Sequence, residues 1–505
     1  MKVLPAGLLR EAEAAAIASG AATVEGLMEA AVEGCLRVFA ARPDWPRRVL
    51  VLAGKGNNGN DALLLASNLR SAGREVVVVS AGPITERTRV NLEQVKREES
   101  SAWIWPDHPE VGGSWTVVDG LLGTGSSGEP RGAVAEMLNW SDGKEIHGVR
   151  VALDFPSGMD PDTGSVAGPC FRADWTLAIG AVKPGCLADA ARGRVGRLLA
   201  ITLPLAFPPS GKGEAFIGPG EACRWIRPLP ADLYKHRKGE VAVWAGSPGM
   251  AGAALLASRA ALRAGAGLVR LFTHPELVPL LAVATPEVMV RAVECRGALP
   301  ETLVQSGTIL AGPGVGRSKD AGLLLRRLAE ETRAAVLLDA DALHPLAGQP
   351  ECLAQFSKRG CVLTPHAGEL AVLLGERSTG RREAVKAWHA RHPGTVLVAK
   401  GPNTLVIDHL GAISHNATGH PGMATAGMGD VLSGIITALM AGGYPPDIAA
   451  RLGVCWHGRA AELAVEGGAE QTLVAGDVIE SLPAAWSEME RLAAGSASGP
   501  ARWSG

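Results

Sequence analysis

The sequence predicts an α/β protein of two domains, because short apolar runs alternate with helical stretches in both halves of the chain. The apolar runs are continuous in Val and Leu and do not alternate with polar residues, which is typical of strands buried on both faces of a parallel sheet. The length of 505 residues fits two large domains as well as three ordinary ones. Apolar residues make up 47% of the chain, which is enough for sizeable buried cores.

The charge balance and the cysteine pattern argue against several classes of protein. With 49 basic and 51 acidic side chains the net charge is −2, which argues against a nucleic-acid or membrane partner held by bulk positive charge. No apolar stretch approaches the roughly 18 residues of a membrane span, and the N-terminus lacks the features of a secretory signal. The eight cysteines are scattered without a CxxC pair, which favours a reducing compartment. We therefore expect a soluble, cytoplasmic protein.

The N-terminal half predicts a Rossmann-like, doubly wound sheet. Strands are expected at 48–54, 75–82, 115–125 and 148–158, with a helix at 61–73 between the first two. This strand–helix–strand order requires right-handed crossovers. Glycine-rich turns follow the strands, and an open α/β sheet binds ligands at the C-terminal ends of its strands.

The amino-acid composition of the sequence changes near residue 200. Residues 203–220 are rich in Pro and Gly and predict an interdomain connection. The expected N-terminal domain is 1–210 and the expected C-terminal domain is 221–492. The small and polar residues of 493–505 predict a disordered tail.

A second α/β series forms the C-terminal half. Strands are expected at 240–246, 307–316, 335–343 and 395–401. A helix is expected from about Asp430 to Met440, and further helices follow it.

Three loops of the N-terminal half are candidates for a binding site. GKGNNGND (54–61) follows a strand and opens a helix, so its backbone N–H groups would face a phosphate, and Asp61 is expected to cap the helix. The second loop follows Asp119, and the third, DFPSG, contains Asp154 and Ser157. One such loop is equally consistent with a tight connection, but three at the same edge of a sheet favour a ligand site.

These loops, with ADWTLAIGAVKPG (173–185), resemble the NAD(P)H-hydrate epimerase family, also called the YjeF N-terminal domain, over about residues 5–205. The resemblance implies a potassium site made of Asn58, Asp119 and Ser157. Their amide, carboxylate and hydroxyl oxygens are hard ligands that suit an alkali cation. The resemblance further implies contacts to the hydrated nicotinamide cofactor from Asn57, Asn58, Gly59, Asn60, Asp61, Gly123, Thr124, Gly125, Ser126, Ser127, Gly128, Glu129 and Asp154. Of these, Asp154 would move the proton at the hydrated ring carbon.

One residue departs from the family pattern. The family usually has Gly where this chain has Asn60. Asn tolerates a left-handed backbone better than most other residues, so we expect the loop to form. Its amide side chain would crowd a phosphate, which puts epimerase turnover in question more than the fold.

The strongest signal of the C-terminal half is TAGMGDVLSGIITAL (425–439). A glycine-flanked turn leads into an apolar helix with Asp430 in its first turn. The N–H groups of Gly427 to Gly429 would face a phosphoryl group, and Asp430 would take a proton from the hydroxyl being phosphorylated. The alternative is that Asp430 only caps the helix.

Companion segments supply further polar groups. The three glycines of GPGVG (312–316) indicate close approach of a ligand to the backbone. Asp339 and Asp341 are expected at alternating strand positions and are either linked to a metal or structural. His366 is alternatively a core histidine, and Lys400, at a strand end, is alternatively a solvated surface lysine.

With GSPGMAGAALLASRAALRAGAGLV (246–269), these segments resemble the ADP-dependent NAD(P)H-hydrate dehydratase family, whose fold is ribokinase-like, over about residues 225–490. The resemblance implies contacts to the hydrated cofactor from Ala253, Gly316, His366 and Asp430. It implies that the adenine nucleotide is held by Lys400, Gly401, Pro402, Asn403, Thr404 and Gly429. ADP would be the phosphoryl donor, with Mg²⁺.

The sequence therefore predicts a bifunctional enzyme that repairs hydrated NADH and NADPH, and we expect it to be a homo-oligomer. The first domain would interconvert the R and S epimers. The second would phosphorylate the S epimer with ADP and eliminate phosphate, which leaves far more readily than hydroxide, so that NAD(P)H, AMP and phosphate are released. Two alternatives remain. One is a ribokinase-like small-molecule kinase with an accessory N-terminal domain, and the other has a non-catalytic N-terminal binding module.

Overall fold

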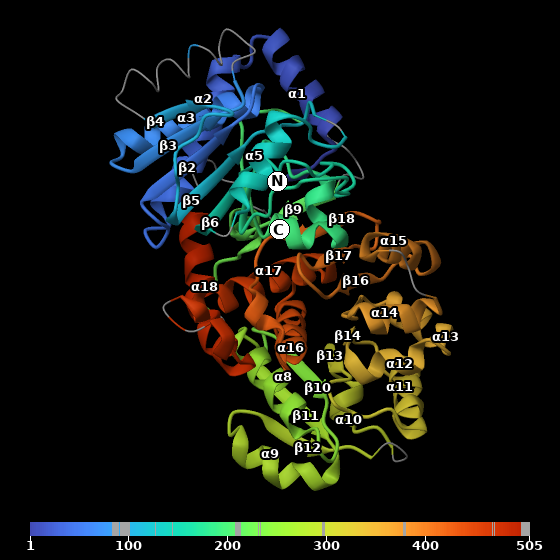
Figure 1. Ribbon diagram of the computed structural model, residues 1–505. Helices are drawn as coiled ribbons and strands as arrows, with labels where there is room; N and C mark the ends of the chain where they lie inside the picture. The colour runs from blue at the N-terminus through green and yellow to red at the C-terminus, as the bar shows by residue number, and fades with distance from the viewer. Residues whose placement is uncertain are drawn as a thin grey trace. The chain divides into compact units, whose positions relative to one another are not determined.

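A computed structural model describes the chain apart from residues 83–89, 91–100, 127, 144, 208–213, 231, 233, 295–297, 377–379, 467, 469 and 496–505. The chain divides into two compact units, Met1–Glu214 and Ala215–Gly505 (Figure 1). Each unit is built from helices and a mainly parallel sheet, which confirms the predicted fold class. The boundary falls inside the Pro- and Gly-rich stretch 203–220.

The first unit contains a wholly parallel sheet in the order β4-β3-β2-β5-β6-β7-β8. Its strands are β2 (Arg48–Ala53), β3 (Glu75–Ser80), β4 (Ser101–Ile104), β5 (Gly113–Gly120), β6 (Ile146–Leu153), β7 (Trp175–Ile179) and β8 (Arg197–Ile201). The chain runs outward from β2 to β4 and then returns to place β5 on the other side of β2. The strand order therefore reverses between β2 and β5, and ligands bind at such a point in doubly wound sheets.

Helices cover both faces of this sheet. They are α1 (Ala6–Ala18), α2 (Val24–Ala40), α3 (Asn57–Ser71), α5 (Ala133–Ser141) and the short α6 (Arg192–Val195), and the two-residue strand β1 (Lys2–Val3) precedes them. Val49 and Val51 pack in a core with α2 and α3, whereas Leu50 and Leu52 pack in a second core with α5. Burial on both faces explains why the strand is a continuous apolar run.

The second unit contains a sheet in which the strands follow the order β9-β18-β17-β16-β15-β14-β13-β10-β11-β12. Pairing is parallel from β12 to β16 and antiparallel through β17 and β18. The strands are β9 (Glu214–Ile217), β10 (Glu240–Trp244), β11 (Leu268–Thr273), β12 (Met289–Ala292), β13 (Thr308–Ala311), β14 (Ala335–Leu338), β15 (Cys361–Leu363), β16 (Val396–Ala399), β17 (Leu405–Ile407) and β18 (Ile413–Asn416).

The longer helices of this unit lie on opposite faces of the sheet. One core includes α8 (Ala251–Arg263), α16 (Met428–Ala441), α17 (Pro446–Val465) and α18 (Ala475–Gly495). The other includes α11 (Lys319–Glu331), α13 (Pro350–Ser357), α14 (Ala367–Leu374) and α15 (Arg381–Arg391). The shorter helices are α7 (Pro219–Ala222), α9 (Val278–Ala284), α10 (Glu301–Val304) and α12 (Leu343–Leu346). Among the described helices, none is both long and apolar enough to cross a membrane.

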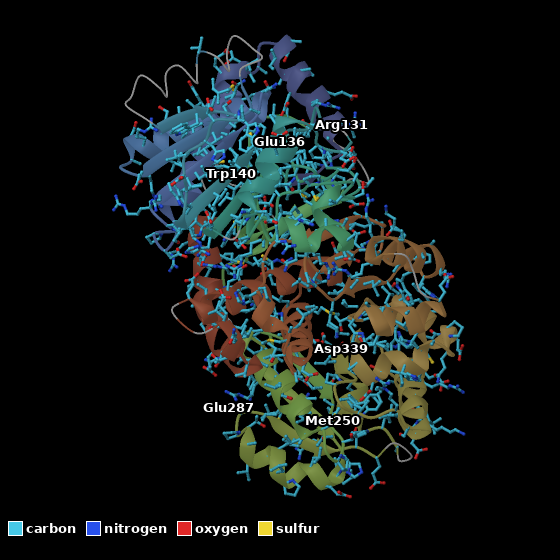
Figure 2. All side chains as sticks on the ribbon, in the orientation of Figure 1. Arg131, Glu136, Trp140, Met250, Glu287 and Asp339 are labelled. Carbon is cyan, nitrogen blue, oxygen red and sulfur yellow. The ribbon has the colours of Figure 1, made fainter. Side chains whose placement is uncertain are left out.

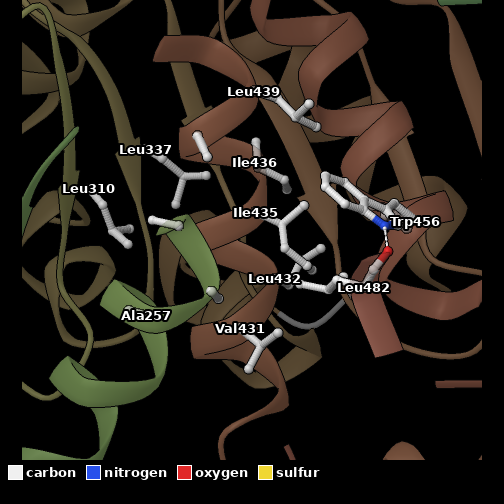
Figure 3. Close-up of a cluster of buried hydrophobic side chains, with 14 of the residues drawn as sticks. Ala257, Leu310, Leu337, Val431, Leu432, Ile435, Ile436, Leu439, Trp456 and Leu482 are labelled. Atoms are coloured by element: carbon white, nitrogen blue, oxygen red, sulfur yellow. Dashed lines mark hydrogen bonds between the residues drawn. The ribbon is translucent and has the colours of Figure 1, made fainter. Parts of the chain in front are cut away.

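Helix α16, which carries the proposed anion-binding turn, is buried along nearly its whole length. Ile435, Ile436 and Leu439 pack near Trp456, whose indole N–H donates to the carbonyl of Leu482 at 2.8 Å (Figure 3). A Cβ on Gly434 would lie 2.4 Å from the carbonyl oxygen of Ala257, so glycine allows α16 to approach α8 closely. This packing fixes the N-terminus of α16 on its scaffold.

Three sequence expectations need correction at the level of elements. The helix expected from residue 61 begins at Asn57, so the glycine-rich loop is shorter than expected. The stretch 203–220 is not only a connection, because β9 forms within it and pairs with β18. Helix α18 extends to Gly495, three residues into the segment expected to be disordered, and the rest of that tail lies outside the described residues.

Candidate active sites

The first site forms where the loops after β2, β5 and β6 meet. Asp119, near the end of β5, is completely buried. The Ser157 backbone N–H donates to its Oδ2 at 2.8 Å, and the Ser157 hydroxyl donates to its Oδ1 at 2.7 Å. Leu122 in turn donates its N–H to Ser157 Oγ at 2.9 Å. These bonds join two of the residues predicted to bind potassium.

Asn58, the third predicted ligand, lies in the first turn of α3 and is 5% exposed. Its amide nitrogen donates to the carbonyl of Leu122 at 2.7 Å and to that of Leu153 at 3.3 Å. The side chain thus ties the start of α3 to the ends of β5 and β6. Because the nitrogen is used by these carbonyls, the amide oxygen is the atom available to a cation.

The electrostatics of Asp119 fit a cation. Burial raises the pKa of Asp119 to about 6, although hydrogen bonds from Ser157 and Leu121 lower it. The carboxylate forms no ion pair with any residue that the structure describes. A buried carboxylate without a counter-ion is unfavourable, whereas a cation ligated by carboxylate, hydroxyl and amide oxygens would compensate it.

The glycines of the first loop are explained by close backbone approaches. A Cβ on Gly54 would lie 1.7 Å from the carbonyl oxygen of Leu121, and one on Gly59 would lie 2.0 Å from that of Gly54. The helix cap differs from the prediction, because Gly56 is the N-cap and Asp61 lies in the second turn. Burial, followed by the charges of Asp154 and Glu13, raises the pKa of Asp61 well above its usual value.

Asn60 does not need the left-handed backbone that the sequence led us to consider. It lies inside α3, where its N–H donates to the carbonyl of Gly56 at 3.1 Å. Its side chain is packed within the unit at 2% exposure, and its amide oxygen has no hydrogen-bond partner among the described residues.

The second loop contacts Asn58. A Cβ on Gly123 would lie 3.1 Å from the Cβ of Asn58, and the Ser126 hydroxyl donates to the carbonyl of Gly123 at 2.7 Å. Thr124 and Gly125 complete this turn, whereas the predicted contact Ser127 lies outside the described residues. Gly128 has a φ of 82°, and Glu129 packs beside Gly168.

Asp154 follows β6 with a φ of 70°, an uncommon conformation for a residue other than glycine. Its Oδ1 accepts the N–H of Ile179 at 3.1 Å and also contacts the ammonium group of Lys183. Lys183 is fully buried and donates to the carbonyl of Ile179 at 2.8 Å. The sequence reasoning missed Lys183; the available signal was a lysine that directly follows the apolar run of 176–182.

The second site lies at the N-terminus of α16. Gly427 is the N-cap with a φ of 87°, and Asp430 lies in the first helical turn without capping it, so the capping alternative is wrong. Burial, then repulsion from Asp339, raises the pKa of Asp430 to about 6, while Lys400 opposes the rise. A carboxylate that titrates near neutral pH is suited to general-base catalysis.

Asp339 and Lys400 form the charged centre of this site. Asp339, which is labelled in Figure 2, is 1% exposed. Its Oδ1 accepts from Lys400 Nζ at 2.7 Å and its Oδ2 accepts from the Ser433 hydroxyl at 2.6 Å. Burial alone would lower the pKa of Lys400, but Asp339 and Glu369 raise it above its usual value. The ammonium group of Lys400 is therefore positively charged at neutral pH, and the alternative of a solvated surface lysine is wrong.

Asp341 has a different role. It lies in the short turn Ala340–Ala342 after β14, so the two aspartates are not at alternating strand positions as predicted. Its carboxylate accepts the N–H of Gly316 at 3.0 Å and the Nε–H of Arg317 at 3.0 Å. Asp341 thus anchors the loop 312–316.

The predicted cofactor contacts Ala253 and Gly316 belong to neighbouring segments. A Cβ on Gly314 would lie 3.1 Å from the Cβ of Ala253, and the Ser247 hydroxyl donates to the carbonyl of Gly314 at 2.8 Å. The loop that ends at Gly316 therefore packs against the start of α8. This close approach requires glycine at position 314.

His366 caps α14 and is not a core residue. Its Nδ1 accepts the N–H groups of Gly368 at 3.0 Å and Glu369 at 3.2 Å, and its side chain is 57% exposed. The ring lines a small pocket with Arg317 and His344. The core-histidine alternative is therefore wrong, and the imidazole is accessible to a ligand.

The predicted nucleotide-binding segment Lys400–Thr404 forms the turn between β16 and β17. Gly401 has a φ of 145° and Asn403 a φ of 46°; the Thr404 hydroxyl donates to the carbonyl of Gly401 at 2.7 Å. Arg381 donates to the carbonyl of Pro402 at 2.6 Å. A Cβ on Gly429 would lie 3.3 Å from Lys400 Nζ, so the turn and the N-terminus of α16 face each other.

The fold and the two sites define a two-domain α/β enzyme. Comparison with known proteins agrees with both halves. Residues 241–483 match the profile of the NAD(P)H-hydrate dehydratase family, and residues 24–185 match that of the YjeF-related protein N-terminus. A ribokinase-like superfamily protein from Enterococcus faecalis has a similar fold, with a TM-score of 0.50 and 23% identity over 57% of this chain and 98% of that one.

Relatives cover nearly the full length. The bifunctional NAD(P)H-hydrate repair enzyme of Coxiella burnetii is 35% identical over 94% of this chain and 97% of its own. The enzyme of Moorella thermoacetica is 34% identical over 86% of this chain and 87% of its own. The enzyme of Escherichia coli is 33% identical over 90% of this chain and 87% of its own. The chain belongs to the family of bifunctional NAD(P)H-hydrate repair enzymes, which confirms the resemblance seen in its loops. It carries both an epimerase-type and a dehydratase-type domain.

Proposed function

We propose that this enzyme repairs hydrated NADH and NADPH in two steps. The first unit interconverts the R and S epimers of the hydrate. The second unit uses ADP to dehydrate the S epimer and releases NAD(P)H, AMP and phosphate. The observation that carries the proposal is the group formed by Asp430, Lys400 and the Gly427–Gly429 turn at the start of a buried helix, in a chain of which a relative covers 94%.

In the second unit, Asp430 accepts the proton of the cofactor hydroxyl. The first N–H groups of α16 have no acceptor within the helix and point toward the transferred phosphoryl group, and Lys400 adds positive charge. Ala253, Gly316, His366 and Asp430 hold the hydrated cofactor. Residues Lys400 to Thr404, with Gly429, hold the adenine nucleotide. Bound Mg²⁺ would neutralise charge on the phosphates.

In the first unit, Asn58, Asp119 and Ser157 hold potassium. Asn57 to Asp61, Gly123 to Glu129 and Asp154 hold the hydrated cofactor, and Asp154 moves the proton at the hydrated carbon. The buried Asp119 carboxylate, which forms no ion pair with any described residue, supports the cation site. The position of Asp154 beside the switch point of the sheet supports its role.

The location and assembly of the enzyme are part of the proposal. The seven cysteines that the structure describes are free thiols, and six of them are buried, which suits a reducing compartment such as the cytoplasm. The partners are small molecules, the hydrates and ADP. We further expect a homo-oligomer.

Product analysis tests the dehydratase assignment against the small-molecule kinase. The full chain is incubated with purified S-NADPH hydrate, Mg²⁺ and either ADP or ATP. We expect NADPH, AMP and free phosphate in equal amounts with ADP. A stable phosphate ester without recovery of the dihydronicotinamide absorbance would identify a kinase instead.

A further inference from the structure

A buried lysine contacts the carboxylate that the epimerase reaction uses. Lys183 follows β7 at the end of an apolar run and has no exposed surface. Its ammonium group contacts Asp154 Oδ1 and donates to the carbonyl of Ile179. Burying an ammonium group is unfavourable unless it is paired, so this pair is a specific feature of the site.

The contact with Lys183 gives the two carboxylate oxygens of Asp154 different surroundings. Oδ1 accepts both the Ile179 N–H and the Lys183 ammonium group. Among the residues that the structure describes, Oδ2 accepts no hydrogen bond. The left-handed backbone at Asp154, with its N–H donating to the carbonyl of Leu177 at 2.8 Å, fixes the direction of the side chain. One oxygen is therefore anchored and the other is available to a substrate.

Other titratable groups surround this pair. Glu13 and Arg10 approach from α1, Cys35 from α2, Asp61 from α3, and Cys186 from the turn after Lys183. Burial and then the charge of Asp154 raise the pKa of both Glu13 and Asp61. Two further carboxyl groups thus lie close to Asp154, and the cation in direct contact with it is Lys183.

We propose that Lys183 is a positioning residue of the epimerase reaction, which anchors Asp154 through Oδ1 so that Oδ2 is held toward the hydrate hydroxyl and exchanges its proton. The proposal rests on the proposed epimerase function. Oδ2 takes the hydroxyl proton as the bond between the hydrated carbon and the ring nitrogen breaks, which leaves an aldehyde and puts the electron pair on nitrogen. The nitrogen re-forms the bond on the other face of the aldehyde and Oδ2 returns the proton to oxygen, so the epimer is inverted and no net proton is consumed.

The test compares Lys183→Gln with the wild-type chain, measuring conversion of R- to S-NADPH hydrate by chromatography between pH 5 and 9 in the presence of K⁺. Without the ammonium group, Asp154 Oδ1 loses its anchor and Oδ2 is no longer held toward the hydroxyl. We expect kcat to fall on the order of 10²-fold, while KM changes little because the groups that hold the cofactor are unchanged. Lys183→Arg, which keeps a cation with N–H donors, should recover part of the lost kcat.

Two controls separate this role from a structural one. Arg37→Gln removes an exposed cation of the same unit and should leave kcat and KM unchanged. A circular-dichroism melt like that of the wild type shows that the first unit is folded, and dehydration of the S epimer shows that the second unit is intact. A folded Lys183→Gln variant with the wild-type kcat, or with a loss that lies in KM and is not recovered by Lys183→Arg, would overturn the proposal.

A second variant serves if Lys183→Gln does not fold. Lys183→Met removes the ammonium group and fills the buried position with an unbranched apolar side chain of similar length. It should lose kcat to the same extent with little change in KM; a wild-type kcat in the folded Lys183→Met variant would contradict the proposal. Failure of the wild-type chain to interconvert the epimers would instead overturn the epimerase function itself, and the role of Lys183 with it.

Discussion

Asp430 lies among groups that make its ionised form destabilise the folded state. Burial and the carboxylates of Asp339 and Asp341 raise its pKa to about 6, and Lys400 only partly offsets them. The folded pKa therefore exceeds the unfolded value, so the folded state binds the proton more tightly. Between about pH 4 and pH 6 stability falls as the pH rises, and above pH 6 the full destabilisation is present. The carboxylate that we propose as the catalytic base is therefore ionised at the expense of stability.

The first prediction concerns catalysis by Asp430. Asp430→Asn should lower kcat for dehydration of the S epimer by about 10²–10⁴-fold, because the amide cannot accept the hydroxyl proton. Conversion of R to S hydrate should be unchanged. The matched control is Asp232→Asn, which breaks an exposed ion pair with Arg237 and should leave both activities intact. Dehydration at the wild-type rate in Asp430→Asn would refute the assigned base.

The second prediction concerns pH. Protonation of Asp430 should make the dehydratase rate fall below about pH 6. By the same linkage, Asp430→Asn should raise the thermal unfolding temperature at pH 8, where the wild-type carboxylate is charged, and give little gain at pH 4, where it is protonated. Differential scanning calorimetry at the two pH values checks this. A variant less stable than the wild type at pH 8 would show that the charge does not destabilise the fold.

The third prediction concerns Asp154. Asp154→Asn should abolish epimerisation at every pH from 5 to 9, since the amide neither takes nor returns the hydroxyl proton. Dehydration of the S epimer should continue at the wild-type rate. Chromatography of both epimers during the reaction measures the two rates separately. An equal fall in S-epimer dehydration would count against two independent sites.

At the scale of elements, the strands were largely predictable and the contacts between loops were not. Continuous apolar runs such as 48–54 predict strands, because both faces of the sheet are buried. Strand β9 was missed because its four residues lie between Pro- and Gly-rich segments and gain stability from pairing with a strand distant in sequence, β18. Tertiary pairing of this kind leaves no local pattern in the sequence.

In the candidate sites too, local features were predictable from the sequence and contacts between distant residues were not. Glycine-rich turns and the aspartates beside them are visible in the sequence because they depend on local backbone geometry. The contact of Lys183 with Asp154 joins residues 29 apart, and that of Lys400 with Asp339 joins residues 61 apart. Such pairs depend on which strands become neighbours. Periodicity alone therefore could not show that Asp339 and Asp341 have different partners.

The fourth prediction tests how α16 is held. Gly434→Ala should destabilise the second unit by about 1–3 kcal/mol, because the new methyl group would lie 2.4 Å from the carbonyl oxygen of Ala257 and 2.9 Å from the Cβ of Ala260. The control is Gly476→Ala in α18, where a Cβ meets no atom within 4 Å. It should be neutral or stabilising by up to about 1 kcal/mol. Urea unfolding measures both; equal effects of the two substitutions would contradict the close packing of α16 on α8.

At the scale of the whole molecule, each of the two units carries its own sheet, core and site. Asp119, Asp154 and Lys183 all belong to the first unit, and Asp339, Lys400 and Asp430 to the second. The division of residues means that each activity should be removable by substitution without loss of the other. Together the two activities would let one chain recover both epimers of the hydrate, although only S is a substrate for dehydration.

The most direct test of this account follows both epimers in a mixture of R- and S-NADPH hydrate with ADP, Mg²⁺ and K⁺, while the dihydronicotinamide absorbance is recorded. The wild-type chain should return both epimers to NADPH. Asp154→Asn should return the S epimer rapidly and the R epimer only at the spontaneous rate of epimerisation. Loss of R at the same slow rate in the wild-type chain would contradict the claim that the first unit is an active epimerase.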